Sequence, residues 1–524
     1  MKHFCLALIY TILFILPYHA FAKKVNIQTF DDLVRAERIS NSTLVIKKEI
    51  DLNKRIVKIA AGSTLIFKGG SLKNGTVVGA QTKLRRTKNN IFHNCEIKGE
   101  WVIECAYSTM FDKDVDAMTL LKNMSRLSPN LKLSTNRSYN LYAQGETIKA
   151  ERLEGDGKDK PKLAFHTTNP NIDGIVIYGN NVTLRNLAVI DDYDVKNNVV
   201  YGSNTPTIGN TIAVKGPNNT VETLTIEDSD FSGGTSSSWV ASSQVKNCLV
   251  KGCTFSGYMA DHGVYCSMKA ETFKVMNCRI NDVTQVSGLF KVRTSERLKY
   301  YGLSNVKAHN YNGYLAVVSL LETPMAEIEF DHITVTKDEG NNSTFYGFCM
   351  GDETNNLRGK GYNAKRITVS DSLFGYGYSG NSIIYPGAGK SVCVEEIIYD
   401  HVEAYESNFG GGCSDRISVN NSRFNECSGD KGIYLCTKEL SIKKSKLNNS
   451  KASNCLLLAN YDNDFMQKLS LQNVEIDANA NTLINIVSGS QIGLQLKDCN
   501  LVKVPRDIYK KPKTCRVDYK KVEK

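Results

Sequence analysis

Several features are scarce or absent in this 524-residue sequence, and each absence excludes a class of protein. After residue 22, no stretch approaches the roughly 20 consecutive apolar residues of a membrane-spanning helix. The fifteen cysteines include no C-x-x-C pair, which argues against a structural zinc site. Tryptophan occurs only twice, whereas tyrosine and glycine occur 25 and 39 times, a composition that suits stacked strands and turns. We therefore predict neither a membrane span nor a zinc domain.

Residues 1–22 have the pattern of a secretory signal peptide. Lys2 is followed by an apolar run, and the segment ends in the small-residue pattern Ala20-Phe21-Ala22. We expect this segment to be removed and the mature protein to be secreted, periplasmic or at the cell surface. Removal of Lys2 with this segment lowers the net charge from +11 to +10, and this basic charge favours an anionic glycan as partner before nucleic acid, although a solvated basic surface explains it nearly as well.

An eight-residue pattern, here called the octad, organises the chain. Two copies, CLVKGCTF (248–255) and FKVMNCRI (273–280), lie 25 residues apart, and each is followed by a glycine-led alternating run, GVYCSM and GLFKVR. Alternation with period two places octad positions 1 and 3 on one face of a strand. The fifth position, Gly252 or Asn277, tolerates left-handed backbone, so we expect the chain to bend there. Two short strands and a bend, repeated at about 25 residues, are typical of one coil of a parallel β-solenoid.

Twelve further octads extend this pattern over most of the chain. They begin at residues 65, 90, 182, 224, 301, 328, 367, 397, 417, 440, 469 and 494. From the octad that ends at Phe231 onward, the spacing varies between 20 and 39 residues, which suits a large coil with loops of variable length. A β-sandwich is the alternative, but a sandwich has no reason to repeat a turn residue followed by a small residue. We predict an all-β solenoid with short capping helices.

The remaining segments set the expected domain boundaries. Thr29 with Asp32 three residues later indicates a helix N-terminus, and a helix there could cover the first coil. Apolar residues at helical spacing within 112–126 predict a second short helix. We expect an N-terminal cap and first coils over 23–110, the main solenoid over 111–505, and a basic C-terminal tail over 506–524.

Cysteine recurs at the sixth octad position. Cys95, Cys253, Cys278 and Cys499 share this position with Ser, Val, Leu, Ile and Gly in other copies. That exchange is typical of a small packing residue in a column, so we favour stacked free thiols. A disulfide framework stays open as the alternative, because an exported protein meets an oxidising compartment.

One stretch resembles a known family. Asp261-His262-Gly263 and, one coil later, Lys291-Val292-Arg293 are similar to the G-H-G and R-I-K motifs of polygalacturonases. These enzymes belong to the pectin-lyase-like superfamily, so the resemblance implies a right-handed parallel β-helix and a polysaccharide substrate. The sequence departs from polygalacturonases at residues 209–214 and 234–243, which contain no acid where hydrolysis needs a carboxylate pair.

β-Elimination by a lyase does not need the carboxylate pair that hydrolysis needs. It needs a base to remove the proton beside a uronate carboxyl group and cations to stabilise the developing charge. Lys291 and Arg293 alternate onto one face of a strand, about one coil from His262 and Asp261. These four residues are the predicted catalytic site, and an ordinary polar strand face is the alternative.

The resemblance also suggests a metal. Asp191, Asp192 and Asp194 could ligate calcium, as acids do in several pectate lyases, but we favour the alternative that they are ordinary loop acids. No other cofactor is predicted.

We therefore predict an exported β-helix protein that binds acidic polysaccharide, with lyase-type β-elimination favoured over hydrolysis if it is an enzyme. The alternative is a non-catalytic glycan-binding or surface-adhesion β-helix.

Overall fold

In the computed structural model, the chain forms two compact units. The N-terminal unit comprises Met1–Val115 and Thr119–Leu131, and the C-terminal unit comprises Asp116–Met118 and Lys132–Lys524. The structure describes residues 23–522 except 143, 195–208, 236, 243, 260, 286–287, 295–297, 321–325, 352–363, 379–380, 386–392, 411–412, 428–431, 452–453, 460–465, 488–490 and 504. The predicted signal segment, residues 1–22, therefore lies outside the described residues. Among the described residues, no helix is long and apolar enough to cross a membrane.

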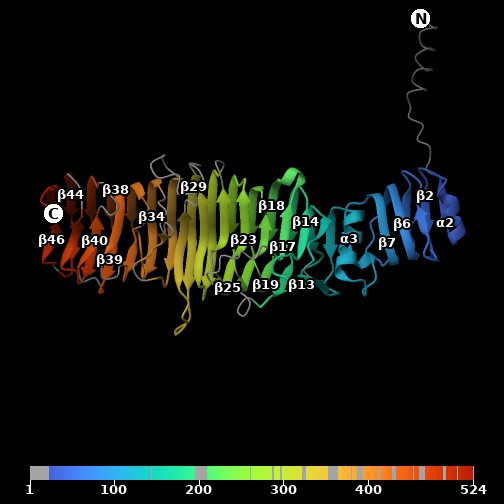
Figure 1. Ribbon diagram of the computed structural model, residues 1–524, viewed down its shortest axis with the longest axis horizontal. Coiled ribbons are helices and arrows are strands. Elements are labelled where there is room, and N and C mark those ends of the chain that lie inside the picture. Colours follow the sequence, from blue (N-terminus) through green and yellow to red (C-terminus); the bar gives the residue numbers. More distant parts are fainter. Residues whose placement is uncertain are drawn as a thin grey trace, which may run out of the picture. The chain divides into compact units, whose positions relative to one another are not determined.

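The N-terminal unit is built on one parallel sheet, drawn in blue in Figure 1. Its strands are β1 (Lys24–Ile27), β2 (Thr43–Ile46), β3 (Glu49–Asp51), β4 (Ile56–Lys58), β5 (Thr64–Phe67), β6 (Ser71–Leu84) and β7 (Phe92–Val102), followed by β8 (Ala106–Tyr107) and a 3-10 turn at Ser108–Met110. The short helix α2 (Phe30–Ala36) begins with the predicted cap. The Thr29 hydroxyl accepts a hydrogen bond from the Asp32 amide at 3.2 Å, and the Asp32 carboxylate accepts one from the Thr29 amide at 3.1 Å. Leu33 and Ala36 are buried next to β1, the first strand, so the predicted capping helix is confirmed.

The second helix, α3 (Ala117–Leu127), is fastened to β7. The Asn123 side chain accepts a hydrogen bond from the Ile97 amide at 3.1 Å and donates one to the Cys95 carbonyl at 3.2 Å. These bonds satisfy two buried backbone groups of β7 and join α3 to that strand. They explain why the N-terminal unit continues to Leu131, whereas we expected it to end at residue 110.

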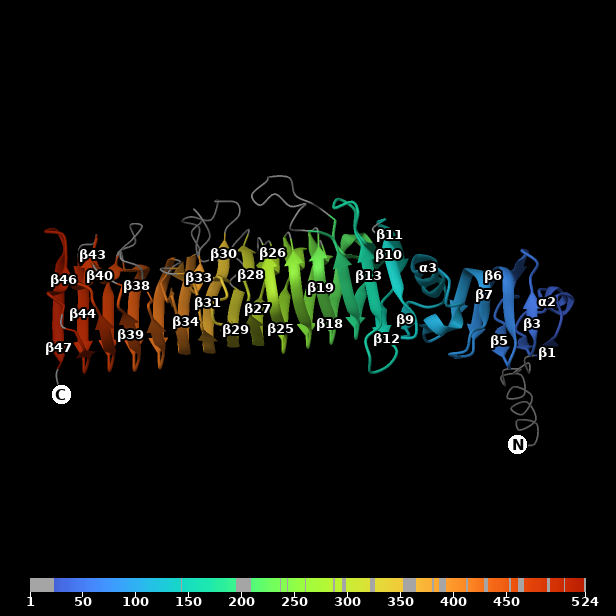
Figure 2. The same cartoon turned by 90° about the horizontal axis from the view of Figure 1, so that it is seen from below.

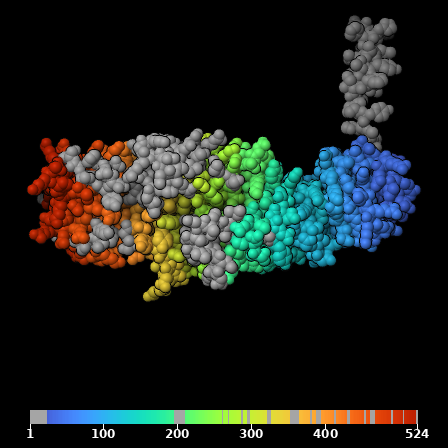
Figure 3. Space-filling model, in the orientation of Figure 1, coloured from blue at the N-terminus to red at the C-terminus, as the bar shows by residue number. Residues whose placement is uncertain are grey.

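The C-terminal unit consists of stacked coils, and its residues follow one another in sequence order from cyan to red in Figures 2 and 3. One wall is a nine-stranded parallel sheet made of β11 (Glu146–Lys149), β14 (Ile175–Tyr178), β17 (Ile212–Lys215), β20 (Ser238–Ser242), β23 (His262–Met268), β26 (Gly288–Thr294), β28 (Gly313–Leu320), β30 (Phe345–Gly351) and β33 (Ile384–Tyr385). We call it the nine-stranded sheet. A two-stranded sheet pairs β32 (Asn381–Ser382) with β35 (Ser407–Asn408).

The other strands of this unit form a larger parallel sheet, here called the large sheet. After β9 (Asn130–Leu133), its strands are β10 (Tyr139–Tyr142), β12 (Arg152–Gly155), β13 (Lys162–His166), β15 (Asn181–Arg185), β16 (Ala188–Asp192), β18 (Val221–Glu227), β19 (Asp230–Thr235), β21 (Val245–Lys251), β22 (Thr254–Met259), β24 (Thr272–Met276), β25 (Arg279–Gln285), β27 (Tyr300–His309), β29 (Ala326–Thr336), β31 (Ala364–Phe374), β34 (Cys393–Tyr405), β36 (Cys413–Asn420), β37 (Arg423–Asn425), β38 (Ile433–Lys443), β39 (Lys446–Asn449), β40 (Cys455–Ala459), β41 (Lys468–Gln472), β42 (Glu475–Ala478), β43 (Thr482–Ile486), β44 (Gln491–Lys497), β45 (Asn500–Leu501), β46 (Asp507–Lys510) and β47 (Arg516–Val522). A 3-10 turn at Pro217–Asn219 precedes β18.

Strand register confirms the predicted parallel β-helix. Val250 pairs with Val275 on the next coil, and Val275 pairs with Leu303 on the coil after that. All three side chains are at most 1% exposed, so octad position 3 forms a column inside the coils. The right-handed winding stays a prediction, which the strong preference of parallel crossovers for that hand supports.

The sixth octad position is mostly buried, and in several coils it holds a short polar side chain, Cys or Ser. The Cys253 thiol donates to the Lys251 carbonyl at 3.4 Å, and the Ser229 hydroxyl, one coil earlier, donates to the Glu227 carbonyl at 2.8 Å. Cysteine and serine can therefore replace one another at this position, because each donates a hydrogen bond to the carbonyl oxygen two residues earlier. Cys253 and Cys278 are both free thiols. A hydrogen bond with Cys278 together with burial raises the pKa of the Cys253 thiol well above its ordinary value, which keeps it protonated and unreactive.

The C-terminal segment is a further coil, which corrects the predicted tail at 506–524. Strand β46 pairs in parallel with β43, and β47 pairs in parallel with β44 over seven residues. The sequence analysis did not recognise RVDYKKV as a strand, because its two successive lysines interrupt the alternation of apolar and polar residues. Pairing satisfies the backbone groups that β43 and β44 would otherwise leave open at a sheet edge.

Candidate functional site

The predicted site lies on the nine-stranded sheet, where neighbouring strands place equivalent residues side by side. Tyr265 on β23 pairs with Lys291 on β26, and Lys291 pairs with Val317 on β28. Val264 and Val292 are fully buried, so the alternating residues Tyr265, Lys291 and Arg293 face outward. The structure thus brings Lys291 and Arg293 to one outer face, as predicted.

Lys291 is positioned by an aromatic ring. Its ammonium nitrogen lies 5.4 Å from the centroid of the Tyr265 ring, within the range of a cation–π interaction. Both Lys291 and Arg293 are half-buried, and the two outward residues beside Arg293 in register, Ser267 and Ser319, are small and buried. Lys291 and Arg293 are therefore more exposed than Ser267 and Ser319 beside them.

His262 occupies a different place from the one we predicted. Its imidazole is completely buried, with Nδ1 2.8 Å from the Gly288 carbonyl oxygen and Nε2 3.0 Å from an Asp261 carboxylate oxygen. The ring thus links two consecutive coils and cannot contact a ligand outside them. His262 is a positioning residue, because it holds Asp261 on one coil and Gly288, the first residue of the strand that carries Lys291, on the next. Asp261 is occupied by this contact, although its side chain is 41% exposed.

The sequence reasoning missed a group of tyrosines beside the same column. The rings of Tyr314 and Tyr346 have centroids 5.4 Å apart, those of Tyr314 and Tyr385 are 5.7 Å apart, and those of Tyr346 and Tyr378 are 5.6 Å apart. Tyr385 pairs with Cys349, which in turn pairs with Val317, so this tyrosine cluster follows Lys291 along the sheet. Each tyrosine lies on a different strand or loop, so no spacing in the sequence marks the cluster.

The structure does not assemble the predicted calcium ligands. Asp191 is buried and accepts hydrogen bonds from the Thr211 hydroxyl at 2.6 Å and the Tyr193 amide at 3.2 Å. Asp192 faces the opposite way and its carboxylate lies 2.6 Å from His166 Nδ1. Successive strand residues alternate between faces, which separates these carboxylates, and Asp194 is an exposed residue beyond the end of β16.

A different group of ligating atoms lies on an octad bend. Atoms of Asp331, His332 and Asp371 lie within 4.8 Å of one another. His332 Nδ1 is 2.8 Å from its neighbour Asp331, and this carboxylate raises the pKa of His332. Asp331 also accepts a hydrogen bond from Ser370 at 2.8 Å. His332 and Asp371 are exposed and Asp331 is half-buried, and contacts between successive bends explain the group.

Comparison with known proteins shows similarity in fold only. No protein-family model and no curated protein matches the chain. Among solved structures, the catalytic domain of a GH87 alpha-1,3-glucanase in complex with nigerose is 13% identical, with a TM-score of 0.37, over 78% of this chain and 67% of that chain. A variant of a GH87 alpha-1,3-glucanase catalytic domain in complex with tetrasaccharides is 12% identical, with a TM-score of 0.31 and the same coverage. Similarity at this level does not indicate a reaction, and the identification of the architecture as a parallel β-helix rests on the strand register alone.

Proposed function

We propose that the protein binds an acidic polysaccharide along the outer face of the nine-stranded sheet. The observation that carries this proposal is the outward register column in which the ring of Tyr265 lies next to the cation Lys291, with Arg293 two residues further along the same strand. The outward positions on either side of this pair, Ala241 and Val317, carry short side chains. Aromatic and cationic groups at successive rungs are the chemistry that a chain of charged sugar rings requires.

The spacing of the coils suits such a chain. Neighbouring parallel strands lie about 4.8 Å apart, a distance comparable to the length of one pyranose unit. Consecutive outward residues can therefore contact consecutive sugars. A tyrosine ring packs against the apolar face of a pyranose, and a guanidinium can hold a carboxylate with two hydrogen bonds. The tyrosine cluster at Tyr314 and Tyr385 would extend the same path beyond Lys291.

Cleavage by β-elimination is the second candidate function. The presence of Lys291 and Arg293 on one face of the same strand favours it over hydrolysis. In this reaction Lys291 would be the base that takes the proton from the ring carbon beside the uronate carboxyl group. The electrons of that bond form a carbon–carbon double bond, and the glycosidic oxygen leaves from the next carbon and gains a proton. Arg293 would neutralise the carboxylate while charge develops. Hydrolysis needs a carboxylate pair, and β20 on the preceding coil offers only Ser238, Trp239, Val240, Ala241 and Ser242.

Export is part of the proposal, because an acidic polysaccharide of this kind lies outside the cytoplasm. The signal-like segment 1–22 supports it. The mass of the mature protein recovered from a producing cell should correspond to a chain that begins near Lys23, and a full-length mass would contradict export by this signal.

The test is binding and turnover on a panel of uronate-containing and neutral polysaccharides. We expect affinity for a uronate polymer, and Arg293→Ala should weaken it by roughly tenfold or more because a charge-assisted hydrogen bond contributes about 1.5–3 kcal/mol. If the wild type releases product that absorbs as an unsaturated uronate, Lys291→Ala should abolish that release and largely spare binding.

The matched control is Lys307→Ala, which removes one exposed positive charge from β27 on the large sheet. It should leave both readouts unchanged. Equal losses in Lys307→Ala and Arg293→Ala would mean that only net charge matters, and unchanged binding in both Lys291→Ala and Arg293→Ala would place the site elsewhere.

A further inference from the structure

The outer face of the large sheet carries a ladder of charges that alternate in sign. Six residues in register on consecutive coils form it, in the order Glu327, Arg366, Glu396, Arg416, Glu439 and Lys468. Arg366 Nε lies 3.1 Å from Glu396, and Arg416 Nε lies 3.7 Å from another oxygen of the same carboxylate. Within the ladder each cation therefore has an acid on a neighbouring rung.

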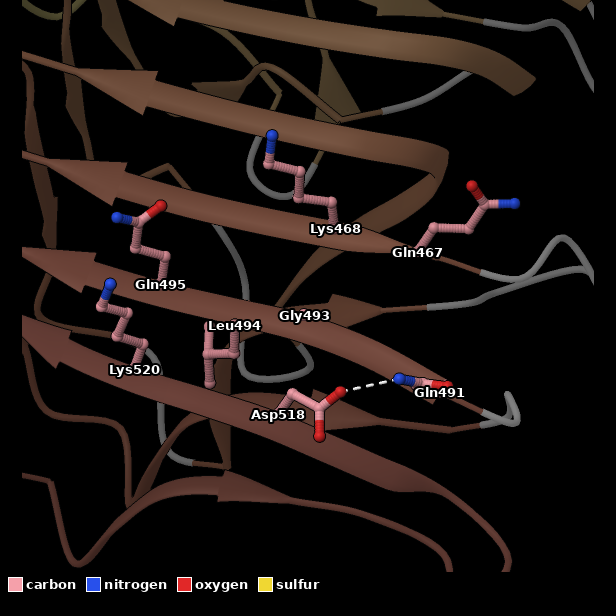
Figure 4. A pocket seen from close by; sticks show the side chains of 8 residues that line it. All are labelled: Gln467, Lys468, Gln491, Gly493, Leu494, Gln495, Asp518 and Lys520. Atoms are coloured by element: carbon pink, nitrogen blue, oxygen red, sulfur yellow. Dashed lines mark hydrogen bonds between the residues drawn. The ribbon is translucent and has the colours of Figure 1, made fainter.

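The ladder is interrupted at the next rung, where Gly493 follows Lys468 and Asp518 follows Gly493. A carboxylate at position 493 would continue the alternation, and the glycine leaves its place empty. A Cβ atom built on Gly493 would approach only the Gln467 carbonyl oxygen, at 3.7 Å, so the space above this residue is open. A hollow of about 680 Å³ lies over it, shown in Figure 4.

Cations and amides line the hollow. Figure 4 shows Lys468, Gln495 and Lys520 on one side of Gly493 and Gln491 with Asp518 on the other. Within the described part of the chain, neither the Lys468 nor the Lys520 ammonium group has an ion pair or a hydrogen bond.

Asp518, in contrast, already has partners. It accepts hydrogen bonds from the Gln491 amide at 2.7 Å and from Arg516 Nε at 3.0 Å, and these contacts lower the pKa of its carboxyl group. The hollow therefore offers two available cations, whereas the Asp518 carboxylate already has hydrogen-bond partners in Gln491 and Arg516.

The hollow continues as a groove toward earlier coils. A second hollow of about 230 Å³ shares Lys468 and Gln495 with the first and extends over the serine column Ser418, Ser441 and Ser470. A third, of about 280 Å³, shares Gln467 and reaches Arg416 on the ladder, and its lining also includes the acids Glu395, Asp415 and Glu439. Short serine side chains between two rows of longer polar side chains give this groove its depth, and it crosses several coils.

We propose that this groove is a second carbohydrate-binding site, in which the hollow over Gly493 takes the carboxylate of a uronate residue. The ligand carboxylate would fill the missing acidic rung and contact Lys468 and Lys520. The amides of Gln467, Gln491 and Gln495 can donate to and accept from sugar hydroxyl groups. The inference takes its ligand class from the proposed function, but its residues belong to the large sheet and none is shared with the Lys291 site. Two sites on different sheets of one rigid solenoid would let the protein hold two chains, or two parts of one chain.

The experiment is a calorimetric titration with an oligogalacturonate, with a neutral oligosaccharide of equal length as reference ligand. The Lys291→Ala/Arg293→Ala variant serves as background, so that only the second site is measured. We expect binding to persist in this background with lower stoichiometry. Adding Lys468→Gln/Lys520→Gln, or adding Gly493→Gln to fill the hollow, should weaken the remaining binding at least tenfold. Gly493 does not have left-handed backbone, so a side chain there does not strain the fold. Lys307→Gln is the matched control and should have no effect.

The outcomes separate the two proposals. If the background variant binds no oligogalacturonate, the second site is wrong and the Lys291 site alone carries the function. If Lys468→Gln/Lys520→Gln in the otherwise native chain removes all binding, the second site stands and the Lys291 site is wrong. Equal affinity for the neutral reference ligand, or unchanged affinity in the natively folded Gly493→Gln variant, overturns the assignment of a uronate carboxylate to this hollow.

Discussion

The fifth residue of every octad has left-handed backbone. Its φ angle ranges from 46° at Asp371 to 83° at Gly69, and the residue is most often Asn, Asp or Gly. Asparagine has a second role, because its amide can bond to the equivalent residue of the neighbouring coil. Asn305 Nδ2 donates to Asn277 Oδ1 at 2.8 Å. At this position a single residue both turns the chain and ties two coils together.

Lys444 breaks this preference and should cost stability. It has φ of 48°, and left-handed backbone costs a residue with an ordinary side chain roughly 1–2 kcal/mol. Its neighbours in the column are Asn421 and Asn473. We expect Lys444→Asn to stabilise the protein by roughly 1 kcal/mol and to raise its Tm, measured by thermal denaturation. Asn473→Lys should lower the Tm by a similar amount, and a lower Tm for Lys444→Asn would contradict this account of the bend.

Asp191 should make stability depend on pH. Burial raises the pKa of its carboxyl group to about 6, above the ordinary value of 3.8, although the hydrogen bond from Thr211 opposes the shift. The folded protein therefore binds this proton more tightly than the unfolded chain does. Stability from this group is present below about pH 4 and is lost as the pH rises to about 6, by roughly 3 kcal/mol at about 1.4 kcal/mol per pKa unit.

Asp191→Asn keeps the shape of the side chain and removes the titration. The difference in Tm between this variant and the wild type should widen in favour of the variant from pH 4 to pH 6 and stay constant above that range. A difference that does not change with pH would show that Asp191 is not protonated on folding.

At the scale of elements, the octads predicted the large sheet closely because their alternation and bend are local. Cys248, Val250 and Phe255 are buried as the period predicts, since each coil repeats the same inward positions. The last coil was missed for a local reason too. Strand β47 carries Lys520 and Lys521 on an otherwise alternating pattern, and its charge suggested a tail.

The sequence predicted the candidate site correctly only for residues whose orientation follows from the alternation of side chains along one strand. Lys291 and Arg293 share an outer face because they are two residues apart on one strand. The burial of His262 depends on where the coil turns between β22 and β23, and no period in the sequence reports that turn. The tyrosine cluster depends on register between coils separated by loops of different length, and the same holds for the charge ladder that ends at Gly493. The octad pattern in the sequence therefore does not predict which residues are in contact between coils.

At the scale of the whole molecule, the stacked coils make stability a sum of contacts between neighbours. Val275 pairs only with Val250 before it and Leu303 after it along the column. The N-terminal unit has its own buried residues, such as Leu44 and Ile46 on β2, and forms a separate compact unit. Damage to one coil should therefore spread to nearby coils before it reaches distant ones.

Val275→Asp tests this view of the molecule. An unpaired carboxylate in the buried column costs several kcal/mol, so the coils around β21, β24 and β27 should open. Hydrogen exchange followed by mass spectrometry should show protection lost most strongly in peptides from these strands and retained in peptides from β2. Lys274→Asp, one residue earlier on the exposed side of β24, is the matched control and should leave protection nearly unchanged. Equal loss of protection in β2 and β24 would mean that the chain unfolds as one cooperative body, and the additive description would then be wrong.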